Sequence, residues 1–363
     1  MKIAVLGGGN GAFAAAADLT LAGHEILMWR RDEAAAAAHR AAGGMIDVRD
    51  FTGDRQVRPA LITSSLASAV AGADLIVCPV PAFAQPDIAR ALAPLLTDDQ
   101  VVFLPPGSFG SVLFAKAMHA AGNHAAASFA ETGTLPWLAR KQGPHSVRIS
   151  GRGKRLPTGV FPQCRTDSAL RVIAAAFPNA IEPCGDALSA ALMNAGPIIH
   201  PPLIVMNAGP IEHFDRWDIH KEGTQAAIRR VTSRLDAERI AVRDALGYGP
   251  PHFPLADHYA AEGDEWMYGR GSHDKLTGSG DWHEHLILRD HRYMREDIQI
   301  GLSLLVSIAA MAGVETPLAR GFLTIGSAIC EEDFDKSGRS LETIGLAGVG
   351  RTTLQALLRD GFA

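Results

Sequence analysis

Two side chains in the second half of the chain combine the residue types needed for proton transfer. His200 stands in an uncharged stretch between prolines, and no neighbour in the sequence would neutralise it. An imidazole can exchange a proton near neutral pH, but a partner must set its tautomer. Asp297 stands where the chain enters an apolar run and can point inward as that partner. Two plainer interpretations stay open, namely a buried structural histidine and a carboxylate at a helix N-terminus.

A glycine-rich segment at the start of the chain predicts a dinucleotide site. Residues 7–12 read GGGNGA and satisfy the pattern G-x-G-x-x-A between an apolar run and an alanine-rich run. In such a turn the glycines allow a tight bend and a close approach to a pyrophosphate, which meets the N-terminus of the following helix. The expected cofactor-binding residues of this turn are Gly7, Gly9, Asn10, Gly11 and Ala12.

The end of the second apolar run bears on which cofactor is bound. It reads Trp29-Arg30-Arg31-Asp32, with arginines where NAD-binding folds usually carry an acidic residue. A guanidinium suits the extra phosphate of NADP, whereas a carboxylate repels it. Arg30 and Arg31 therefore favour NADP, with NAD left open, and the alternative is that both are solvated loop charges.

Two more residues follow strands at the edge where ligands bind in such folds. Pro81 lies in a stiff turn that we expect to wall the nicotinamide site, and so counts as cofactor-binding. Glu131 is the acidic residue at this edge, where it can accept a hydrogen bond from a substrate amine or from the cofactor. The equally weighted alternative for Glu131 is a carboxylate at a helix start. His283 and His285 have no further ligand motif, so no metal site is expected.

The elements that must position these residues divide the chain in two. Residues 1–184 alternate short apolar runs with alanine-rich helical stretches, which predicts an α/β domain with a doubly wound, Rossmann-type sheet. A run at 146–150 is expected to be a later strand of this layer. Residues 185–363 show mainly helical periodicity and predict an all-α domain for substrate binding and catalysis. Residues 256–290 form a long polar stretch, which is uncommon unless it covers a site.

Composition excludes several classes of function. The 363 residues carry 34 Lys+Arg and 39 Asp+Glu, a net charge of −5, which argues against nucleic acid and membrane surfaces as partners. The apolar stretch 187–211 contains four prolines, two asparagines and a histidine, so we interpret it as buried helices. The four cysteines form no CxxC pair, and glycines interrupt the apolar start, which together favour a cytoplasmic protein.

The sequence resembles the opine dehydrogenases of the octopine/nopaline type over nearly its whole length. The resemblance rests on a combination of motifs, at residues 7–11, 131–136, 194–201, 222–224, 235–239 and 292–297. It implies a nucleotide-binding domain, then a helical domain, with the active site in the cleft. The implied reaction joins the amine of an amino acid to the carbonyl of a 2-keto acid and reduces the imine with NAD(P)H.

The resemblance also assigns residues. His200 resembles the catalytic histidine and Asp297 its orienting acid, while Arg292 resembles the arginine that grips a substrate carboxylate. We count Asn194 with Arg292 and Glu131 as substrate-binding. The implied partners are therefore an amino acid and a 2-keto acid, and a homo-oligomer is possible.

Two other functions remain open at this stage. One is an NADP-dependent reductase of a 2-keto or 3-hydroxy acid, although such enzymes usually use a lysine and no lysine here lies in an apolar helical stretch. The other is a non-catalytic NADP-binding sensor, which would need Gly7, Gly9 and Arg30 but neither His200 nor Asp297.

Overall fold

The computed structural model describes residues 1–278, 280 and 282–362. They form two compact units. The first unit comprises residues 1–80, 84–191 and 357–363, and the second comprises 81–83 and 192–356. The long stretch of the first unit therefore ends at residue 191, a little beyond the expected boundary at 184. Residues 81–83 belong to the second unit, and the C-terminal segment from residue 357 belongs to the first.

The first unit is built on an eight-stranded sheet with the order β12-β11-β8-β7-β6-β1-β2-β5. All neighbouring strands pair in parallel except β8 and β11, which pair antiparallel. This arrangement confirms the predicted Rossmann-type sheet. The strands are β1(Lys2–Leu6), β2(Glu25–Trp29), β5(Leu61–Thr63), β6(Leu75–Val77), β7(Val101–Leu104), β8(Ser128–Thr132), β11(Leu156–Phe161) and β12(Ile181–Asp186).

Helices connect these strands because the sequence alternates β-rich and alanine-rich segments. The alanines of α1(Asn10–Leu21) at positions 12 and 14–17 are fully or almost fully buried, so this helix packs its small side chains closely between sheets. The other helices are α2(Glu33–Ala41), α3(Leu66–Val70), α4(Gln85–Leu92), α5(Gly110–Ala120), α6(Thr166–Ala176) and α7(Ala187–Ala191), with short 3₁₀ turns η1(Ala82–Ala84), η2(Ala93–Leu95) and η3(Gln163–Arg165).

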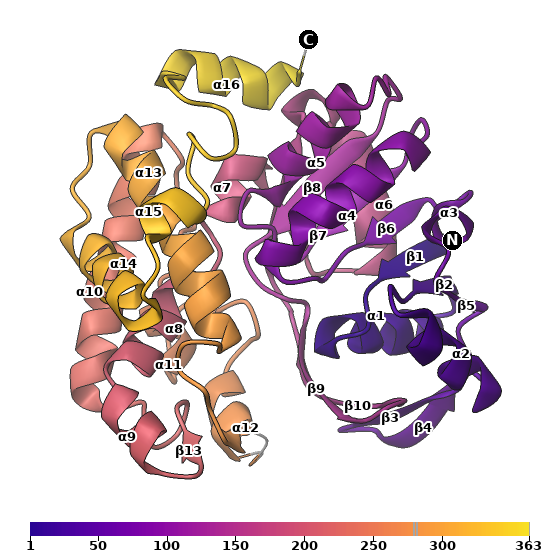
Figure 1. Cartoon of the computed structure of the whole chain (residues 1–363), viewed down its shortest axis with the longest axis horizontal. Coiled ribbons are helices and arrows are strands. Elements are labelled where there is room, and N and C mark those ends of the chain that lie inside the picture. The colour runs from indigo at the N-terminus through magenta and orange to yellow at the C-terminus, as the bar shows by residue number, and fades with distance from the viewer. Residues whose placement is uncertain (279, 281, 363) are drawn as a thin grey trace. The chain divides into compact units, whose positions relative to one another are not determined.

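A second sheet of four strands packs on α1, on the side shown at the bottom of the first unit in Figure 1. Its order is β4-β3-β10-β9, and its strands are β3(Ile46–Asp50), β4(Gly53–Val57), β9(Trp137–Gly143) and β10(Ser146–Arg152). The expectation that residues 146–150 belong to the main layer is wrong. The run is a strand, but it pairs with β3 and β9, and its local pattern carries no information about distant partners.

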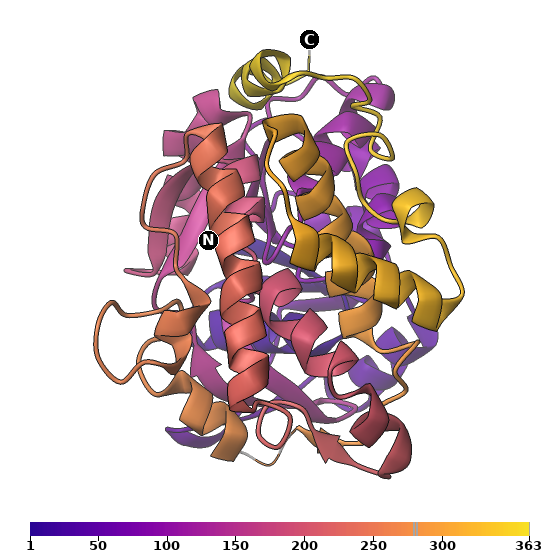
Figure 2. The same cartoon turned by 90° about the vertical axis from the view of Figure 1, so that its left-hand side faces the viewer.

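The second unit is helical, as predicted. Its longest helix, α10(Ala226–Leu246), stands upright in the middle of Figure 2. A π-helix, η4(Tyr293–Leu302), runs directly into α13(Ser303–Ala312). The remaining elements are α8(Gly196–Val205), α9(Ala208–His213), β13(Trp217–Asp218), α11(Leu255–Tyr259), α12(Ser272–Gly278), β14(His283–Glu284), α14(Pro317–Cys330), α15(Phe334–Ser337) and α16(Arg351–Asp360).

One apolar stretch in the described residues, Ala187–Val205, has the length and composition of a membrane span. However, 72% of it is buried inside the fold. Its second part is α8, which holds Pro201 and Pro202 within the helix. Burial of this kind is what the core helix of a globular domain shows.

Candidate active site

The helical unit brings His200 and Asp297 together, although they lie far apart in the sequence. His200 lies on α8 and Asp297 on η4, and the distance from His200 Nδ1 to Asp297 Oδ2 is 2.7 Å. The side chain of Asp297 is 7% exposed and that of His200 is 16% exposed. A hydrogen bond to Nδ1 orients the ring and fixes which nitrogen faces outward. The geometry is therefore that of a base with its orienting acid.

Two glycines allow α8 and η4 to approach closely enough for this pair. A Cβ atom at Gly196 would lie 2.2 Å from Asp297 Oδ1, and one at Gly301 would lie 2.2 Å from Pro197 Cγ. Both distances are far inside van der Waals contact, so a larger residue at either position would push the elements apart. The wider turns of a π-helix are rare and occur often at functional sites. Asp297 therefore reaches His200 because glycine, which has no Cβ atom, occupies both positions where α8 and η4 approach each other.

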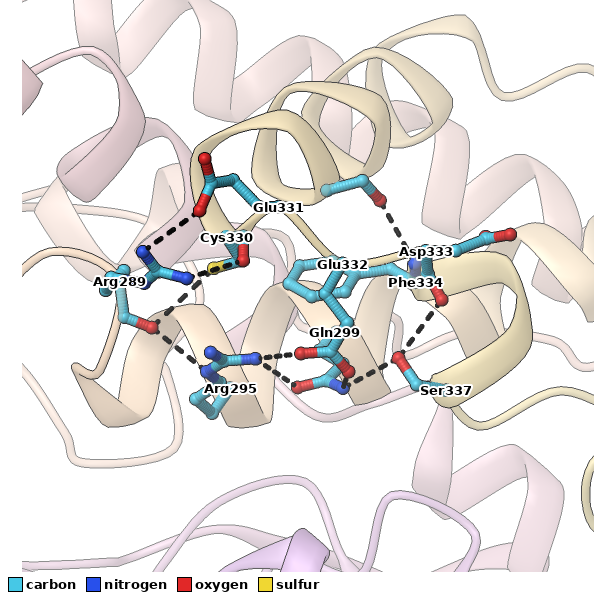
Figure 3. A network of polar contacts seen from close by, with 10 residues as sticks. Arg289, Arg295, Gln299, Cys330, Glu331, Glu332, Asp333, Phe334 and Ser337 are labelled. Atoms are coloured by element: carbon cyan, nitrogen blue, oxygen red, sulfur yellow. Dashed lines mark hydrogen bonds and ion pairs between the residues drawn. The ribbon is translucent and has the colours of Figure 1, made fainter.

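The side of η4 that bears Arg295 and Gln299 is fixed by a polar network (Figure 3). Both side chains bond to the carboxylate of Glu332, and Gln299 also donates to Ser337 Oγ at 2.9 Å. Arg295 Nε donates in addition to the carbonyl oxygen of Arg289 at 3.0 Å. These bonds hold the π-helix, and with it Asp297, in one position.

Aromatic side chains enclose the imidazole of His200. The ring of Tyr293 stacks on it, with 3.5 Å between the centroids and an interplanar angle of 6°. The Tyr293 hydroxyl lies 3.3 Å from Nε2 of the buried His220. The rings of His220 and Trp282 form a T-shaped pair with 4.7 Å between their centroids. The polar stretch 256–290 thus reaches this cluster through Trp282, while Ser279 and Asp281 of that stretch lie outside the described residues. Its role as a cover stays a prediction.

Burial sets the protonation of the pair. It lowers the pKa of His200 well below the usual value, and the nearby charge of Arg292 lowers it further. Burial raises the pKa of Asp297 to about 7, against the pull of Arg292. The imidazole is therefore neutral at neutral pH. With its Nδ1–H donated to the carboxylate, Nε2 keeps a lone pair that can accept a proton.

Arg292 and Glu296 flank this pair. Arg292 is exposed, and its guanidinium carbon lies 5.0 Å from the ring centroid of Tyr293. Glu296 has no role assigned from the sequence, although its place beside Asp297 is a usable signal. Glu296 Oε1 accepts from Ala82 N at 3.3 Å, and burial together with the charge of Asp297 raises the pKa of Glu296 to about 7. Arg339 donates to the carbonyl oxygen of Ala82 at 2.9 Å.

These two bonds hold residues 81–83 in the helical unit. Pro81 was assigned to the cofactor site because its turn follows a strand of the Rossmann-type sheet. The structure groups it instead with the residues around Glu296. Its contact with the nicotinamide stays a prediction.

The raised pKa of Glu296 predicts that the variant Glu296→Gln becomes more stable against unfolding, relative to wild type, as the pH rises. In the folded protein the carboxyl holds its proton up to about pH 7, whereas in the unfolded chain it loses the proton near its ordinary value of 4.5. Raising the pH through this window therefore favours the unfolded state of the wild type. Urea unfolding should show the stability of Glu296→Gln relative to wild type increasing from about pH 4.5 to about pH 7. The exposed Glu342→Gln is the control, and a difference that does not change with pH would contradict the buried acid.

Asn194 has a local structural contact. Its side chain is almost buried, and Oδ1 accepts from Gly196 N at 3.0 Å just before α8. This contact supports the turn that sets Gly196 beside Asp297. Its expected contact with substrate stays a prediction.

The substrate-binding assignment of Glu131 is corrected by the structure. Glu131 is fully buried on β8, and its carboxylate accepts from Phe109 N at 2.7 Å, Ser111 N at 2.9 Å and Ser111 Oγ. These donors lie at the start of α5, where unpaired backbone N–H groups attract a carboxylate. The alternative interpretation, a carboxylate at a helix start, is therefore the right one.

Replacing Glu131 with alanine should destabilise the first unit. The change leaves three buried donors unpaired, and each costs about 1–3 kcal/mol. We expect the free energy of unfolding to fall by about 3 kcal/mol or more in urea titrations. The Michaelis constants of the folded fraction should stay at wild-type values. A raised Michaelis constant for either substrate without loss of stability would restore the binding role.

The glycine turn has the features of a nucleotide site. Gly7 has φ +125°, a conformation open mainly to glycine. A Cβ atom at Gly9 would meet no atom of the described residues within 4 Å, so the backbone there is open to a ligand. Helix α1 starts at Asn10, and no described side chain caps it. Its first N–H groups are therefore suited to a phosphate.

The end of β2 lines a cavity of about 270 Å³. Gly7, Gly8, Arg30, Arg31 and Asp32 are among its lining residues. The Asp32 carboxylate accepts from Ala35 N at 3.1 Å and so caps α2. The glycine turn and the two arginines fit the binding of an NAD(P) nucleotide. Lys141, for which the sequence predicts no role, also reaches this turn and donates from Nζ to Gly8 O at 3.3 Å.

His283 and His285, the two histidines considered as metal ligands, each have a contact with one other residue. His283 Nε2 is 4.0 Å from Glu222 Oε2, and His285 Nδ1 is 3.0 Å from Asp215 O. Within residues 1–278, 280 and 282–362, no group of three His, Cys, Asp or Glu side chains is placed to hold a metal ion.

Comparison with known proteins relates each unit to a family of enzymes. Residues 183–330 match the family model described as NAD/NADP octopine/nopaline dehydrogenase, alpha-helical domain, and residues 3–161 match that of ketopantoate reductase PanE/ApbA. The opine dehydrogenase of Arthrobacter sp. (strain 1C) is 28% identical over 95% of each chain. Both findings support a relation of the chain to the opine dehydrogenases.

Solved structures of opine dehydrogenases share the fold. Octopine dehydrogenase with NADH and L-arginine aligns with a TM-score of 0.74 at 18% identity, over 100% of this chain and 99% of that one. Yersinopine dehydrogenase with bound NADP⁺ aligns with a TM-score of 0.67 at 15% identity, over 99% and 97%. The matches over the helical unit and over nearly the whole chain indicate that the protein is an NAD(P)-dependent oxidoreductase.

Proposed function

We propose that the protein condenses the amine of an amino acid with the carbonyl of a 2-keto acid and reduces the resulting imine, as an opine dehydrogenase does. The reduction would turn the C=N bond of the imine into a CH–NH group, and the reverse reaction would oxidise that group. The observation that carries the proposal is the hydrogen-bonded His200–Asp297 pair, with Arg292 next to η4. A base, its orienting acid and a carboxylate-binding guanidinium are the groups that this chemistry requires.

Arg292 would bind the carboxylate of the keto acid. Its guanidinium is exposed and its planar donors match a carboxylate in a bidentate arrangement. The positive charge also favours the neutral form of His200. One residue would therefore hold the substrate and tune the base.

His200 would move the protons of the condensation. An amino acid carries its amine as an ammonium ion, which must lose a proton before nitrogen can attack the keto carbon. The neutral Nε2 is suited to accept that proton. The imidazolium, stabilised by Asp297, would return it to the hydroxyl group that leaves as water when the imine forms. Asn194 beside the pair is our further candidate for a substrate contact.

The first unit would hold the nicotinamide cofactor. When bound, that cofactor supplies the hydride that reduces the imine carbon. Gly7, Gly9, Asn10, Gly11 and Ala12 would hold the pyrophosphate at the start of α1. Arg30 and Arg31 in the cavity at the end of β2 favour NADP(H) over NAD(H).

A substrate panel tests the proposed function. The purified chain is given NADPH or NADH, pyruvate or another 2-keto acid, and single amino acids, and oxidation of the cofactor is followed by absorbance. We expect oxidation only when keto acid and amino acid are both present, with a secondary amine as the product by mass spectrometry. Absence of oxidation in every combination would overturn the proposal and support a nucleotide-binding sensor.

One observation favours a second candidate function. Residues 3–161 of the first unit match the family model of ketopantoate reductase, an enzyme that reduces a keto acid. Oxidation of NADPH with a keto acid alone, and no effect of added amino acids, would support such a reductase instead.

A further inference from the structure

Lys141 reaches the glycine turn from a separate sheet. It lies on β9, which packs against α1, and its backbone N–H donates to Asn10 Oδ1 at 3.0 Å. Its Nζ donates to the carbonyl oxygen of Gly8 at 3.3 Å and lies 4.1 Å from the ring centroid of Phe13. The bond to Asn10 thus sets the position of the strand, and the side chain places a positive charge on the turn.

Arg30 approaches the same turn from the end of β2. A Cβ atom at Gly8 would lie 3.5 Å from Arg30 Nε, and the guanidinium carbon lies 5.5 Å from the Phe13 centroid. Another guanidinium nitrogen donates to the carbonyl oxygen of Ala35 at 2.8 Å. Lys141 and Arg30 therefore converge on Gly8 and on one aromatic ring, from elements about a hundred residues apart in the chain.

No carboxylate in the described part of the chain forms an ion pair with either cation. Burial lowers the pKa of Lys141, and the charge of Arg30 lowers it further. Asp32 is near Arg30 but caps α2, and the stacked imidazoles of His39 and His145 also lie in this field. Two like charges held together without a counter-ion favour binding of an anion.

We propose that Lys141 and Arg30 together hold the 2′-phosphate of NADP(H), so that Lys141 determines the choice of cofactor. This inference rests on the proposed nucleotide site. In such a fold the ribose lies at the end of the second strand, whereas the pyrophosphate lies at the helix N-terminus. Lys141 contacts Gly8, and Gly8 and Arg30 both line the cavity at the end of β2.

Equilibrium binding of NADPH and NADH to the full chain tests this assignment. Lys141→Met is expected to weaken NADPH binding by about 10- to 100-fold, as for loss of a charge-assisted hydrogen bond, and to leave NADH binding nearly unchanged. Lys141→Arg keeps the charge and should retain most of the affinity for NADPH. Lys154→Met, at an exposed lysine of the same unit, is the matched control and should change neither affinity.

Competition locates the phosphate. In the wild type, 2′-AMP should displace NADPH at lower concentration than 5′-AMP does, and Lys141→Met should abolish that difference. An equal loss of NADPH and NADH binding in Lys141→Met would overturn the proposal, because it would place the lysine on the shared pyrophosphate. Unchanged NADPH binding would overturn it as well. Binding is measured without turnover. If the protein binds NADPH as expected but does not join an amino acid to a keto acid, only the proposed reaction is wrong and the assignment of Lys141 stands.

Discussion

Replacing His200 with alanine is expected to lower the turnover number by about 10²–10⁴-fold, the usual contribution of a positioned acid–base group. Nε2 would accept the ammonium proton and return it to the leaving hydroxyl, and alanine can do neither. The affinity for NADPH should stay the same, because the glycine turn and Arg30 belong to the other unit. Steady-state kinetics and nucleotide binding on the same preparation measure both.

Two further variants sharpen this experiment. Asp297→Asn replaces the carboxylate by a neutral amide of the same size. The amide cannot stabilise an imidazolium by its charge, and its NH2 group can bond to the other ring tautomer, so this variant should also lower turnover. His213→Ala changes an exposed histidine on the neighbouring α9 and should leave turnover at the wild-type value. If His200→Ala retains wild-type turnover, the histidine has no place in the mechanism.

Replacing Gly196 with alanine is expected to lower turnover by about 10²-fold, although glycine has no side chain to act on a substrate. The added methyl group would lie 2.2 Å from Asp297 Oδ1, so the aspartate or the start of α8 must move. A displacement of about 1 Å in an active site can cost that factor. Crowding in a packed region should also lower the free energy of unfolding by about 1–3 kcal/mol.

Gly209→Ala provides the matched control on α9. A Cβ atom there would meet none of the described atoms within 4 Å. Alanine is the better helix former, so this variant should be as stable as wild type or up to about 1 kcal/mol more stable, with unchanged turnover. Thermal or urea unfolding and kinetics of both variants make the comparison. Equal behaviour of the two would mean that Gly196 is not required for the position of Asp297.

Local patterns in the sequence predicted the nucleotide-binding half well. An apolar run is expected directly before residue 7 and a second one up to Trp29, and β1 and β2 end at Leu6 and Trp29, with the glycine turn between β1 and α1. A strand of alternating or continuous apolar residues and a glycine with positive φ depend mainly on neighbours in the chain. The same is true of Arg30, whose place at the end of β2 follows from the strand alone.

Features that depend on distant partners were wrong or missing. Glu131 has the residue type of a ligand-binding acid, but three donors of α5 use its carboxylate. The strand β10 was expected in the main sheet because nothing in its own residues identifies β3, about a hundred positions earlier, as its partner. Lys141 was overlooked for this reason, since its distance from Gly8 exists only once β9 packs on α1.

The amino-acid sequence alone determined which chemical groups the protein has for the proposed reaction: an imidazole between prolines, an acid before an apolar run, and arginines that suit anions. Folding determined their distances and their protonation. His200 and Asp297 meet at 2.7 Å because Gly196 and Gly301 let a π-helix and α8 approach, and burial then shifts both pKa values. A residue type is local, whereas a distance and a desolvation depend on everything that packs around them.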